Sequence, residues 1–400
     1  MNRMELRDVS CYLRAPHRTR GADKKNAGLN PEIIEVHAIY FALHAPLALL
    51  TIMSLKNVAV IGGGSFGTVI ANIIAHNGHH TQLWMRDVDQ VESLNATRQN
   101  AAYMPGLELH EKVVATHDLQ AVVTGVDMIF VAVPSGSFRT VVRQMKPFLK
   151  PGIILISATK GIEAVTFRLM SQILAEEVPG SRIAVLSGPN LAREIAQRTP
   201  TGTVVASADD EVRRLVQDVL HSETFRVYSN DDMLGVEFGG SLKNIYAIIA
   251  GLADSQGMGQ NTISMLITRS LTEMARFGVR LGADPMTFLG LSGVGDLIVT
   301  CSSPLSRNFR VGKALGEGKD IDLIINELGQ VAEGVNTVKQ VKQKADELGV
   351  PMPLCSSLYE IIYNKAGIGH IIASLMLEET GLDVEFEVGK AKYLGGNSAR

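Results

Sequence analysis

The chemistry-bearing feature with the clearest spacing is a glycine-rich loop behind a short apolar run. Residues 56–61 are mostly apolar and lead into Gly62-Gly-Gly64-Ser-Phe-Gly67, which a helix-type stretch follows. In a Gly-x-Gly-x-x-Gly loop the first glycine permits a tight turn, and the second lets the backbone approach a pyrophosphate. The third lets the helix pack close to the strand, and the helix N-terminus offers free N–H groups to the phosphates. Spacing and context therefore predict a dinucleotide site rather than a purely structural turn.

The residues after the second predicted strand bear on which dinucleotide is bound. An acidic residue at that strand end would bind the ribose 2′-hydroxyl of NAD. The strand expected over 81–85 is followed instead by Arg86, with Asp87 one place later. A guanidinium suits the 2′-phosphate of NADP, so we expect NADP to be preferred and NAD to be accepted. The alternative is that Arg86 forms only a surface ion pair.

Two lysines stand in polar tracts that a hydrophobic core does not need, Ala158-Thr-Lys160-Gly161 and Gly240-Ser-Leu-Lys243-Asn244. Reduction of a ketone by hydride requires a proton donor for the nascent alkoxide, and a lysine can serve if its pKa is lowered. A second ammonium nearby lowers that pKa and stabilises oxyanion charge. A single lysine is more often a solvated surface charge, but the two tracts together favour a functional pair.

Further polar groups follow in the second half of the chain. Asp296 and Thr300 are four residues apart and share one face if the stretch is helical. Asp296 then either orients Lys243 or binds a substrate hydroxyl, unless it only caps a helix after a glycine turn. Arg307 offers a planar fork for a phosphate, with Ser306 and Asn308 as neutral donors beside it.

The elements that must position these groups alternate between strand and helix up to about residue 230. Near-continuous apolar runs predict buried parallel strands, and helix-type segments such as 68–77, 138–149 and 167–177 lie between them. The expected strands are 56–61, 81–85, 127–133, 152–157, 182–187, 202–206 and 224–228. Lys160 follows one of these strands, at the sheet edge where α/β proteins bind ligands.

Strand patterns then disappear for over a hundred residues. The segments 242–251, 262–277, 285–291, 320–328, 337–348 and 354–363 have helical patterns. The predicted fold class is α/β: a Rossmann-type parallel-sheet domain over 54–231, followed by an all-α substrate and catalytic domain over 232–382. Residues 383–400 are expected to be a polar tail.

Residues 1–53 are expected to be a disordered or non-native extension. The first thirty are polar, and the apolar stretch 38–53 is interrupted by His44 and Pro46, so it is shorter than a bilayer span requires. The favoured interpretation is that translation starts at Met53 and that the residues before it are not part of the native protein. A membrane anchor and a targeting segment remain alternatives.

Composition narrows the class of protein. The chain of 400 residues has 46% hydrophobic residues and a net charge of −3, which is unlike a dedicated nucleic-acid binder. Its three cysteines are too few for a disulfide framework and favour a reducing, cytoplasmic location. The histidines lack metal-ligand spacing, so no metal is expected. A homodimer remains one candidate oligomeric state.

Taken in order, the glycine loop and the tracts around Lys160, Ser187–Asn190, Lys243, Asp296, Arg307 and Val331–Gly334 resemble the NAD(P)-dependent glycerol-3-phosphate dehydrogenase family. The bacterial biosynthetic branch is the most similar, and the resemblance covers about residues 56–375. It implies reversible reduction of dihydroxyacetone phosphate to sn-glycerol 3-phosphate, for glycerophospholipid synthesis.

The resemblance also implies site residues. Lys243 would be the catalytic acid/base, with Lys160, Asp296 and Thr300 as catalytic partners. Cofactor contacts would come from Gly62, Gly64, Ser65, Phe66, Gly67, Arg86, Lys160, Ala192, Arg307, Val331 and Glu333. Substrate contacts would come from Lys160, Gly188, Asn190, Lys243, Asp296, Ser306, Arg307 and Asn308. Asn190 departs from the Ser or Thr that is common in the family at this place.

Two other functions remain open. A β-hydroxyacid or sugar-phosphate dehydrogenase would have a similar two-domain build, and a non-catalytic NAD(P)H-binding redox sensor would keep the glycine loop. The joint presence of Lys160, Lys243, Asp296 and Arg307 argues against the sensor.

Overall fold

The computed structural model describes residues 56–328, 333–369, 371 and 376. Its N-terminal part is an eight-stranded sheet in the order β3-β2-β1-β4-β5-β6-β7-β8. All neighbouring strands are parallel except β6 and β7. The strands are β1 (Asn57–Ile61), β2 (His80–Trp84), β3 (Val113–Thr116), β4 (Met128–Val131), β5 (Ile154–Ser157), β6 (Arg182–Ser187), β7 (Thr201–Ala206) and β8 (Phe225–Asn230).

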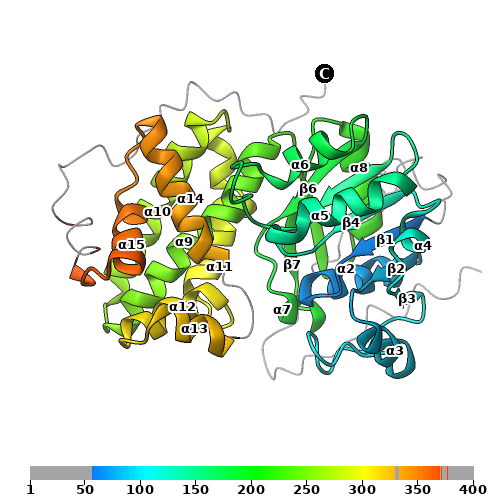
Figure 1. Cartoon of the computed structure of the whole chain (residues 1–400), viewed down its shortest axis with the longest axis horizontal. Helices are drawn as coiled ribbons and strands as arrows, with labels where there is room; N and C mark the ends of the chain where they lie inside the picture. The colour runs from blue at the N-terminus through cyan, green and yellow to red at the C-terminus, as the bar shows by residue number, and fades with distance from the viewer. Residues whose placement is uncertain (1–55, 329–332, 370, 372–375, 377–400) are drawn as a thin grey trace, which may run out of the picture. The chain divides into compact units, whose positions relative to one another are not determined.

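Helices cover both faces of this sheet (Figure 1). One face packs against α2 (Ser65–His76), α3 (Val88–Thr97), α7 (Ala192–Ala196) and α8 (Asp210–Leu220). The other packs against α4 (Leu119–Val123), α5 (Ser135–Met145), with a 3-10 turn at Lys146–Phe148, and α6 (Met170–Glu177). Burial on both faces explains why the inner strands β4 and β5 are almost entirely apolar, with every residue buried.

The sequence predicted the fold class of this domain correctly. The structure differs from the prediction in the following details. Strand β3 was not predicted, and the antiparallel β6–β7 pair makes the sheet mixed rather than wholly parallel. The helix expected from Phe167 begins at Met170, because Phe167 has a φ of 56°, which a helix does not accept.

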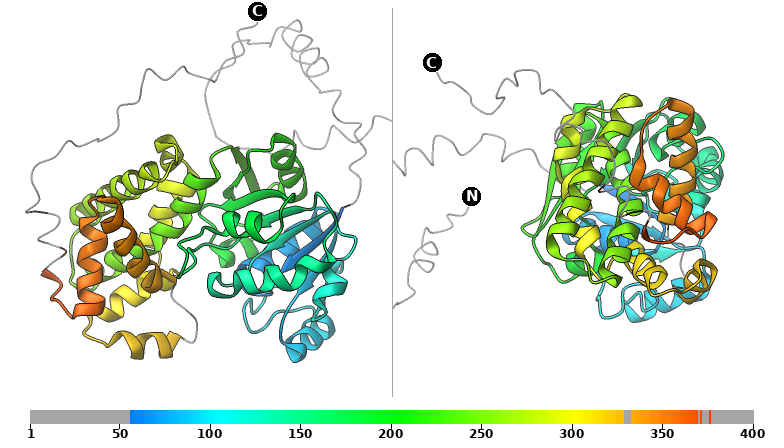
Figure 2. Two further views of the ribbon diagram at one scale, coloured as in Figure 1. Left: turned by 45° about the horizontal axis from the view of Figure 1, so that its top comes forward. Right: turned by 90° about the vertical axis from the view of Figure 1, so that its left-hand side faces the viewer.

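From Met233 onward the described residues are helical and contain no strand (Figure 2). The elements are α9 (Met233–Ser255), α10 (Gln260–Arg280), a 3-10 turn η4 (Pro285–Leu289), a π-helical turn η5 (Leu291–Gly295), α11 (Asp296–Ser302), α12 (Arg307–Gly316), α13 (Ile321–Leu328), α14 (Glu333–Leu348) and α15 (Pro353–Asn364). The sequence did not predict α12, and it began the central helix at Leu242 instead of Met233.

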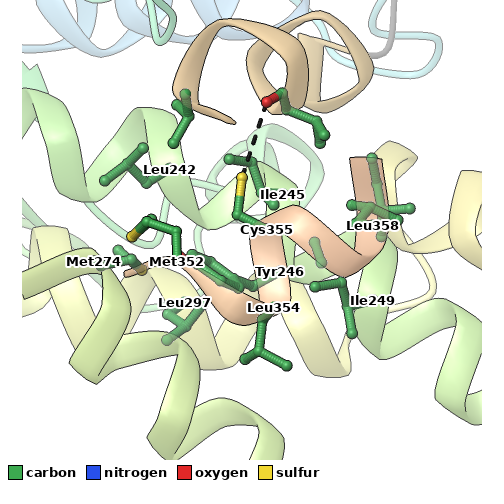
Figure 3. Packing of buried hydrophobic residues seen from close by; sticks show 14 of the residues in the cluster. Leu242, Ile245, Tyr246, Ile249, Met274, Leu297, Met352, Leu354, Cys355 and Leu358 are labelled. Carbon is green, nitrogen blue, oxygen red and sulfur yellow. Dashed lines mark hydrogen bonds between the residues drawn. The ribbon is translucent and has the colours of Figure 1, made fainter. Parts of the chain in front are cut away.

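Helix α9 is the centre of this domain, and nearly all of its side chains are buried. Figure 3 shows Leu242, Ile245, Tyr246 and Ile249 of α9 packing against residues of α10, α11 and α15. Glycines bring α12 close to α9, since a Cβ at Gly312 would lie 1.8 Å from the Ile248 carbonyl oxygen. The close crossing holds the start of α12 beside the middle of α9.

The expected extension over 1–53 and the expected tail over 383–400 lie outside the described residues.

Candidate active site

The glycine loop fits the approach of a dinucleotide at the point where strand order reverses, between β1 and β4. Gly62 has a φ of 116°, and a Cβ there would lie 2.6 Å from the carbonyl oxygen of Ala132, directly after β4. A Cβ at Gly67 would lie 1.9 Å from the Gly62 oxygen, so only glycine allows this helix-to-loop contact. Gly64 is different, because a Cβ there meets nothing within 4 Å. Its backbone is therefore accessible to a phosphate.

The remaining loop residues begin α2. Ser65 donates a hydrogen bond from its hydroxyl to the carbonyl oxygen of Tyr103 (3.1 Å), and Phe66 packs partly buried against the sheet core. Asn100 donates to the Gly63 carbonyl (2.8 Å) from a neighbouring loop. The loop is thus held in shape by the protein alone.

Arg86 and Asp87, the two residues that bear on the choice of dinucleotide, have different contacts in the structure. Asp87 caps α3, where its carboxylate accepts a hydrogen bond from the Gln90 amide (3.0 Å). Arg86 is exposed and makes no hydrogen bond or ion pair with any described residue. The surface ion pair considered for Arg86 is therefore absent from the described part of the chain, and the guanidinium is available to an external anion.

Four predicted residues meet between the sheet and the helical domain. Lys160, shortly after β5, donates to Asp296 Oδ2 (2.5 Å) and to the Gly188 carbonyl (3.0 Å). Lys243, from the middle of α9, donates to Asp296 Oδ1 and to Thr300 Oγ1 (2.7 Å). Thr300 in turn donates to the Asp296 carbonyl oxygen (2.6 Å), which confirms that both lie on one face of α11. One carboxylate therefore joins two ammonium groups from different domains.

Burial sets the electrostatics of this cluster. Asp296 has no exposed surface and Lys243 is 7% exposed. Burial lowers the pKa of Lys243 to about 8; the Lys160 ammonium acts in the same direction and the Asp296 carboxylate opposes it. Lys243 is thus an ammonium at neutral pH and a neutral amine in mildly alkaline solution.

A second group of predicted residues lies at the start of α12. Ser306 caps this helix by accepting a hydrogen bond from the Phe309 amide (3.3 Å). Arg307 is the first helical residue, and Asn308 donates to Asn244 Oδ1 (2.9 Å) on α9. Because Asn244 follows Lys243, this bond fixes the N-terminus of α12 beside the lysine.

Glu333 is the first residue of α14 and lies near Ser135, Arg307 and Lys160. The amide and hydroxyl of Ser135 at the start of α5, and the charges of Arg307 and Lys160, lie close enough to favour the ionised form of its carboxyl. Burial nevertheless raises its pKa. Val331, the other residue predicted in this tract, lies outside the described residues.

The tract after β6 contacts Lys160 through a backbone carbonyl group. Gly188 has a φ of 147°, and its carbonyl receives Lys160. Asn190 donates to Thr203 Oγ1 (2.9 Å), while its Oδ1 is buried and has no hydrogen-bond partner. Ala192 begins α7 and packs partly buried against the sheet core.

Two residues that organise the site were missing from the predicted set. Asn244 belongs to the Lys243 tract but no role was predicted for it, although its side chain connects α9 to α12. Ser135 was not among the predicted residues, yet it acts on the pKa of Glu333 and packs against Gly161, where a Cβ would lie 2.7 Å from the serine Cβ. A serine at the start of a helix that follows a sheet strand was the available signal for Ser135.

Among the described residues, none of the helices has the length and apolar character needed to cross a bilayer, and no cluster of three His, Cys, Asp or Glu suited to a metal occurs.

Known proteins match this chain over both domains. Residues 57–213 match the N-terminal, and 232–373 the C-terminal, sequence model of NAD-dependent glycerol-3-phosphate dehydrogenase. The chain is 52% identical over 350 residues to glycerol-3-phosphate dehydrogenase [NAD(P)+] of Saccharophagus degradans, covering 88% of this chain and 98% of that one. It is 56% identical over 329 residues to the enzyme of the same name from Pseudomonas entomophila, covering 82% and 96%.

A solved structure agrees. Glycerol-3-phosphate dehydrogenase from Coxiella burnetii superposes with a TM-score of 0.77 at 37% identity, covering 81% of this chain and 99% of that one. On these matches, and with the glycine loop and the lysine–aspartate cluster in place, the chain belongs to the NAD-dependent glycerol-3-phosphate dehydrogenase family.

Proposed function

We propose that this chain catalyses the reversible, NAD(P)H-dependent reduction of dihydroxyacetone phosphate to sn-glycerol 3-phosphate, which supplies glycerophospholipid synthesis. The observation that carries this function is that the buried Lys243 and the part-buried Lys160 share the single carboxylate of Asp296. The pair supplies a proton and positive charge at one place, which carbonyl reduction requires.

Lys243 is the general acid. Reduction adds a hydride to the carbonyl carbon and a proton to the carbonyl oxygen. Burial keeps the pKa of Lys243 at about 8, so its ammonium exists at neutral pH and gives up a proton readily. In the reverse direction the neutral amine accepts the proton of the substrate hydroxyl. Asp296 and Thr300 orient the Nζ atom through the bonds described above.

Lys160 places an ammonium group beside the carbonyl oxygen. It is held from two sides, by Asp296 and by the Gly188 carbonyl, so its position does not depend on the substrate. An ammonium placed in advance stabilises the negative charge that develops on oxygen without reorganising in the transition state. It also keeps the pKa of Lys243 low.

The substrate phosphate binds at the N-terminus of α12. The first turn of a helix attracts anions, and the Arg307 guanidinium adds a bidentate fork at the first helical position. The Ser306 hydroxyl and the Asn308 amide stand on either side of it in the sequence. Since Asn308 is bonded to Asn244, the phosphate and the carbonyl are aligned by neighbouring positions of α9.

The dinucleotide is held by the glycine loop, with Ser65 and Phe66 at the start of α2. When bound, its reduced nicotinamide supplies the hydride. Arg86 would bind the 2′-phosphate of NADP; the Asp87 carboxylate is engaged as a helix cap and would not compete for the ribose. Ala192, Val331 and Glu333 complete the proposed cofactor contacts.

The location and assembly are further proposals. We place the enzyme in the cytoplasm, since Cys301 and Cys355 are both free and buried. Large apolar side chains on η4 and α11 are exposed, which supports a homodimer; they are Met286, Leu289 and Ile298. Sedimentation at the mass of one chain, 43.1 kDa, would contradict the dimer.

One assay tests the function against its rivals. Purified protein is mixed with NADPH or NADH, and oxidation is followed by absorbance with dihydroxyacetone phosphate, and separately with a 3-oxoacid. Rapid turnover with dihydroxyacetone phosphate alone supports the reaction. Turnover with the oxoacid alone would favour a β-hydroxyacid dehydrogenase, and binding of NADPH without any turnover would favour a sensor.

A further inference from the structure

A loop of the sheet domain is inserted into the helical domain directly behind Lys160. Residues 161–171 leave the sheet, and Ile162 and Leu169 pair with each other as an isolated bridge that closes the base of the loop. Both side chains are buried in the core cluster of the helical domain, not in that of the sheet. Phe167 packs edge-on against Phe277 of α10, with ring centroids 6.0 Å apart.

Two side chains of α9 hold the two ends of this loop. Glu237 accepts hydrogen bonds from the Ser171 amide (2.9 Å) and from the Ser171 hydroxyl, at the N-terminus of α6. Ser241 accepts one from the Gly161 amide (3.0 Å), immediately after Lys160. Glu237 and Ser241 are four residues apart and therefore lie on one face of α9. We call this pair the α9 clamp.

The same face of α9 meets Lys160 between the two clamp residues. A Cβ at Gly240 would lie 2.4 Å from Ser187 Oγ and 3.5 Å from the Lys160 side chain. The helix thus approaches the strand ends as closely as glycine allows. Lys243 follows on the next turn and meets Asp296, which Lys160 also binds.

The α9 clamp affects one distance in particular, that between Lys160 and the Asp296–Lys243 pair. Lys243, Asp296 and Thr300 all belong to the helical domain, so their mutual bonds do not depend on the loop. Lys160 belongs to the sheet domain and is joined to them only across the domain boundary. From this geometry we propose that Glu237 is a positioning residue, which with Ser241 holds loop 161–171 on α9 and so keeps Lys160 within reach of Asp296 and Lys243.

Hydrogen bonding explains why an acidic side chain suits this position. Glu237 is 4% exposed, and its oxygens accept the Ser171 amide and hydroxyl in the first turn of α6, where the positive end of the helix dipole offsets part of the cost of burying the group. A side chain that only filled space would leave the Ser171 amide without a partner inside the protein, at the cost of an unsatisfied donor.

The chain contains a matched control. Glu273 on α10 is 2% exposed and accepts from the amides of Leu354 and Cys355 at the start of α15. It is therefore also a buried carboxylate at a helix N-terminus, but every one of these contacts lies within the helical domain. Burial raises the pKa of both carboxyls to about 7.

The test compares Glu237→Gln with Glu273→Gln by two measurements. The first is amide hydrogen exchange of loop 161–171, which does not depend on catalysis. We expect exchange to become faster in Glu237→Gln and to remain as in the wild type in Glu273→Gln. Unchanged exchange in a folded Glu237→Gln protein would overturn the clamp.

The second measurement is the alkaline limb of kcat/KM for dihydroxyacetone phosphate, and it rests on the proposed role of Lys243. When Lys160 withdraws, its repulsion is lost and Asp296 serves Lys243 alone, so both changes raise the pKa of Lys243. We expect the limb to move to higher pH in Glu237→Gln and kcat/KM to fall by about 10- to 100-fold, the scale of a misplacement near 1 Å. A loss of stability alone would lower the amount of active enzyme and leave the limb in place.

Ser241→Ala decides the question if Glu237→Gln does not fold, since it removes a single oxygen from the other end of the clamp. The same faster exchange and the same upward movement of the limb are expected. Faster exchange without movement of the limb, or an equal movement in Glu273→Gln, would overturn the positioning role. A wild-type enzyme without an alkaline limb would contradict the proposed Lys243 chemistry, while the exchange measurement would still judge the clamp.

Discussion

Replacement of Lys243 by Met tests the proposed proton donor most directly. Methionine keeps an unbranched apolar stem in the buried space on α9 but removes the ammonium that binds Asp296 and Thr300. Loss of a general acid lowers a rate by about 10²- to 10⁴-fold, or about 2.7–5.5 kcal/mol of activation free energy. Lys160 remains on Asp296 and still stabilises oxyanion charge. We therefore expect the lower half of this range, about 10²- to 10³-fold in kcat.

The pH dependence gives this prediction a sign. With a pKa of about 8, Lys243 is an ammonium below that pH and an amine above it. In the wild type kcat/KM for reduction should fall as the pH rises through about 8, and kcat/KM for oxidation of glycerol 3-phosphate should rise over the same interval. Both limbs should vanish in Lys243→Met.

The assay is the change of NADPH absorbance in both directions, with NADPH affinity measured by fluorescence as the control. The affinity should be almost unchanged, because the proposed pyrophosphate contacts lie in the glycine loop. Near-wild-type kcat, or alkaline limbs that persist in Lys243→Met, would refute the assignment and make Lys160 the next candidate.

Four further outcomes are expected. Arg86→Asp should shift the ratio of kcat/KM from NADPH towards NADH, since a carboxylate repels the 2′-phosphate; an unchanged ratio would mean that Arg86 does not contact it. Arg307→Lys should lower kcat/KM for dihydroxyacetone phosphate by about 10- to 150-fold, the equivalent of one charge-assisted hydrogen bond, and should hardly affect dihydroxyacetone; equal losses would exclude a phosphate contact. Gly64→Ala should leave Tm unchanged and weaken NADPH binding, whereas Gly67→Ala should lower Tm, because only the second Cβ meets protein atoms; calorimetry and a binding titration distinguish them. Removal of residues 1–52 should leave Tm and kcat as they are, since β1 begins at Asn57; a large fall in either would contradict this.

Local sequence signals predicted the parts of the fold whose causes are local. The glycine loop followed from spacing, because the steric demand on Gly67 comes from Gly62, five residues earlier, and the loop directly joins β1 to α2. Strand β3 escaped prediction because it is only four residues long and alternates between buried and exposed positions. Its assignment rests on pairing with β2, about thirty residues away in the sequence. The antiparallel direction of β7 likewise depends on a partner strand, not on its own residues.

For the proposed site, the sequence indicated candidate residues but not how they are connected. The sequence predicted that Lys160 and Lys243 lie in one site. This prediction came from the position of Lys160 at the ligand-binding edge of the sheet and from the family resemblance. The sequence left open whether Asp296 orients Lys243 or binds a substrate hydroxyl. In the structure Asp296 forms an ion pair with each lysine. Asp296 and Lys160 are 136 residues apart in the sequence. The π-helical turn before α11, which directs Asp296 inward, depends on close contacts such as that of Gly239 with the Ser292 carbonyl. Such contacts leave no periodic pattern in the sequence.

The charge balance of the cluster explains how a chain with a net charge of −3 would bind a phosphate ester. Lys160 and Lys243 outnumber the one carboxylate between them, while the exposed Arg307 acts on the pKa of Glu333. The lysine–aspartate cluster thus carries a net positive charge in a largely buried place, where its field is weakly screened by solvent. A buried ion cluster is a poor source of stability, because desolvation offsets much of its attraction. The arrangement of the cluster is better explained by the proposed reaction. Asp296 holds the two lysine ammonium groups close together, so that the charge of Lys160 lowers the pKa of Lys243.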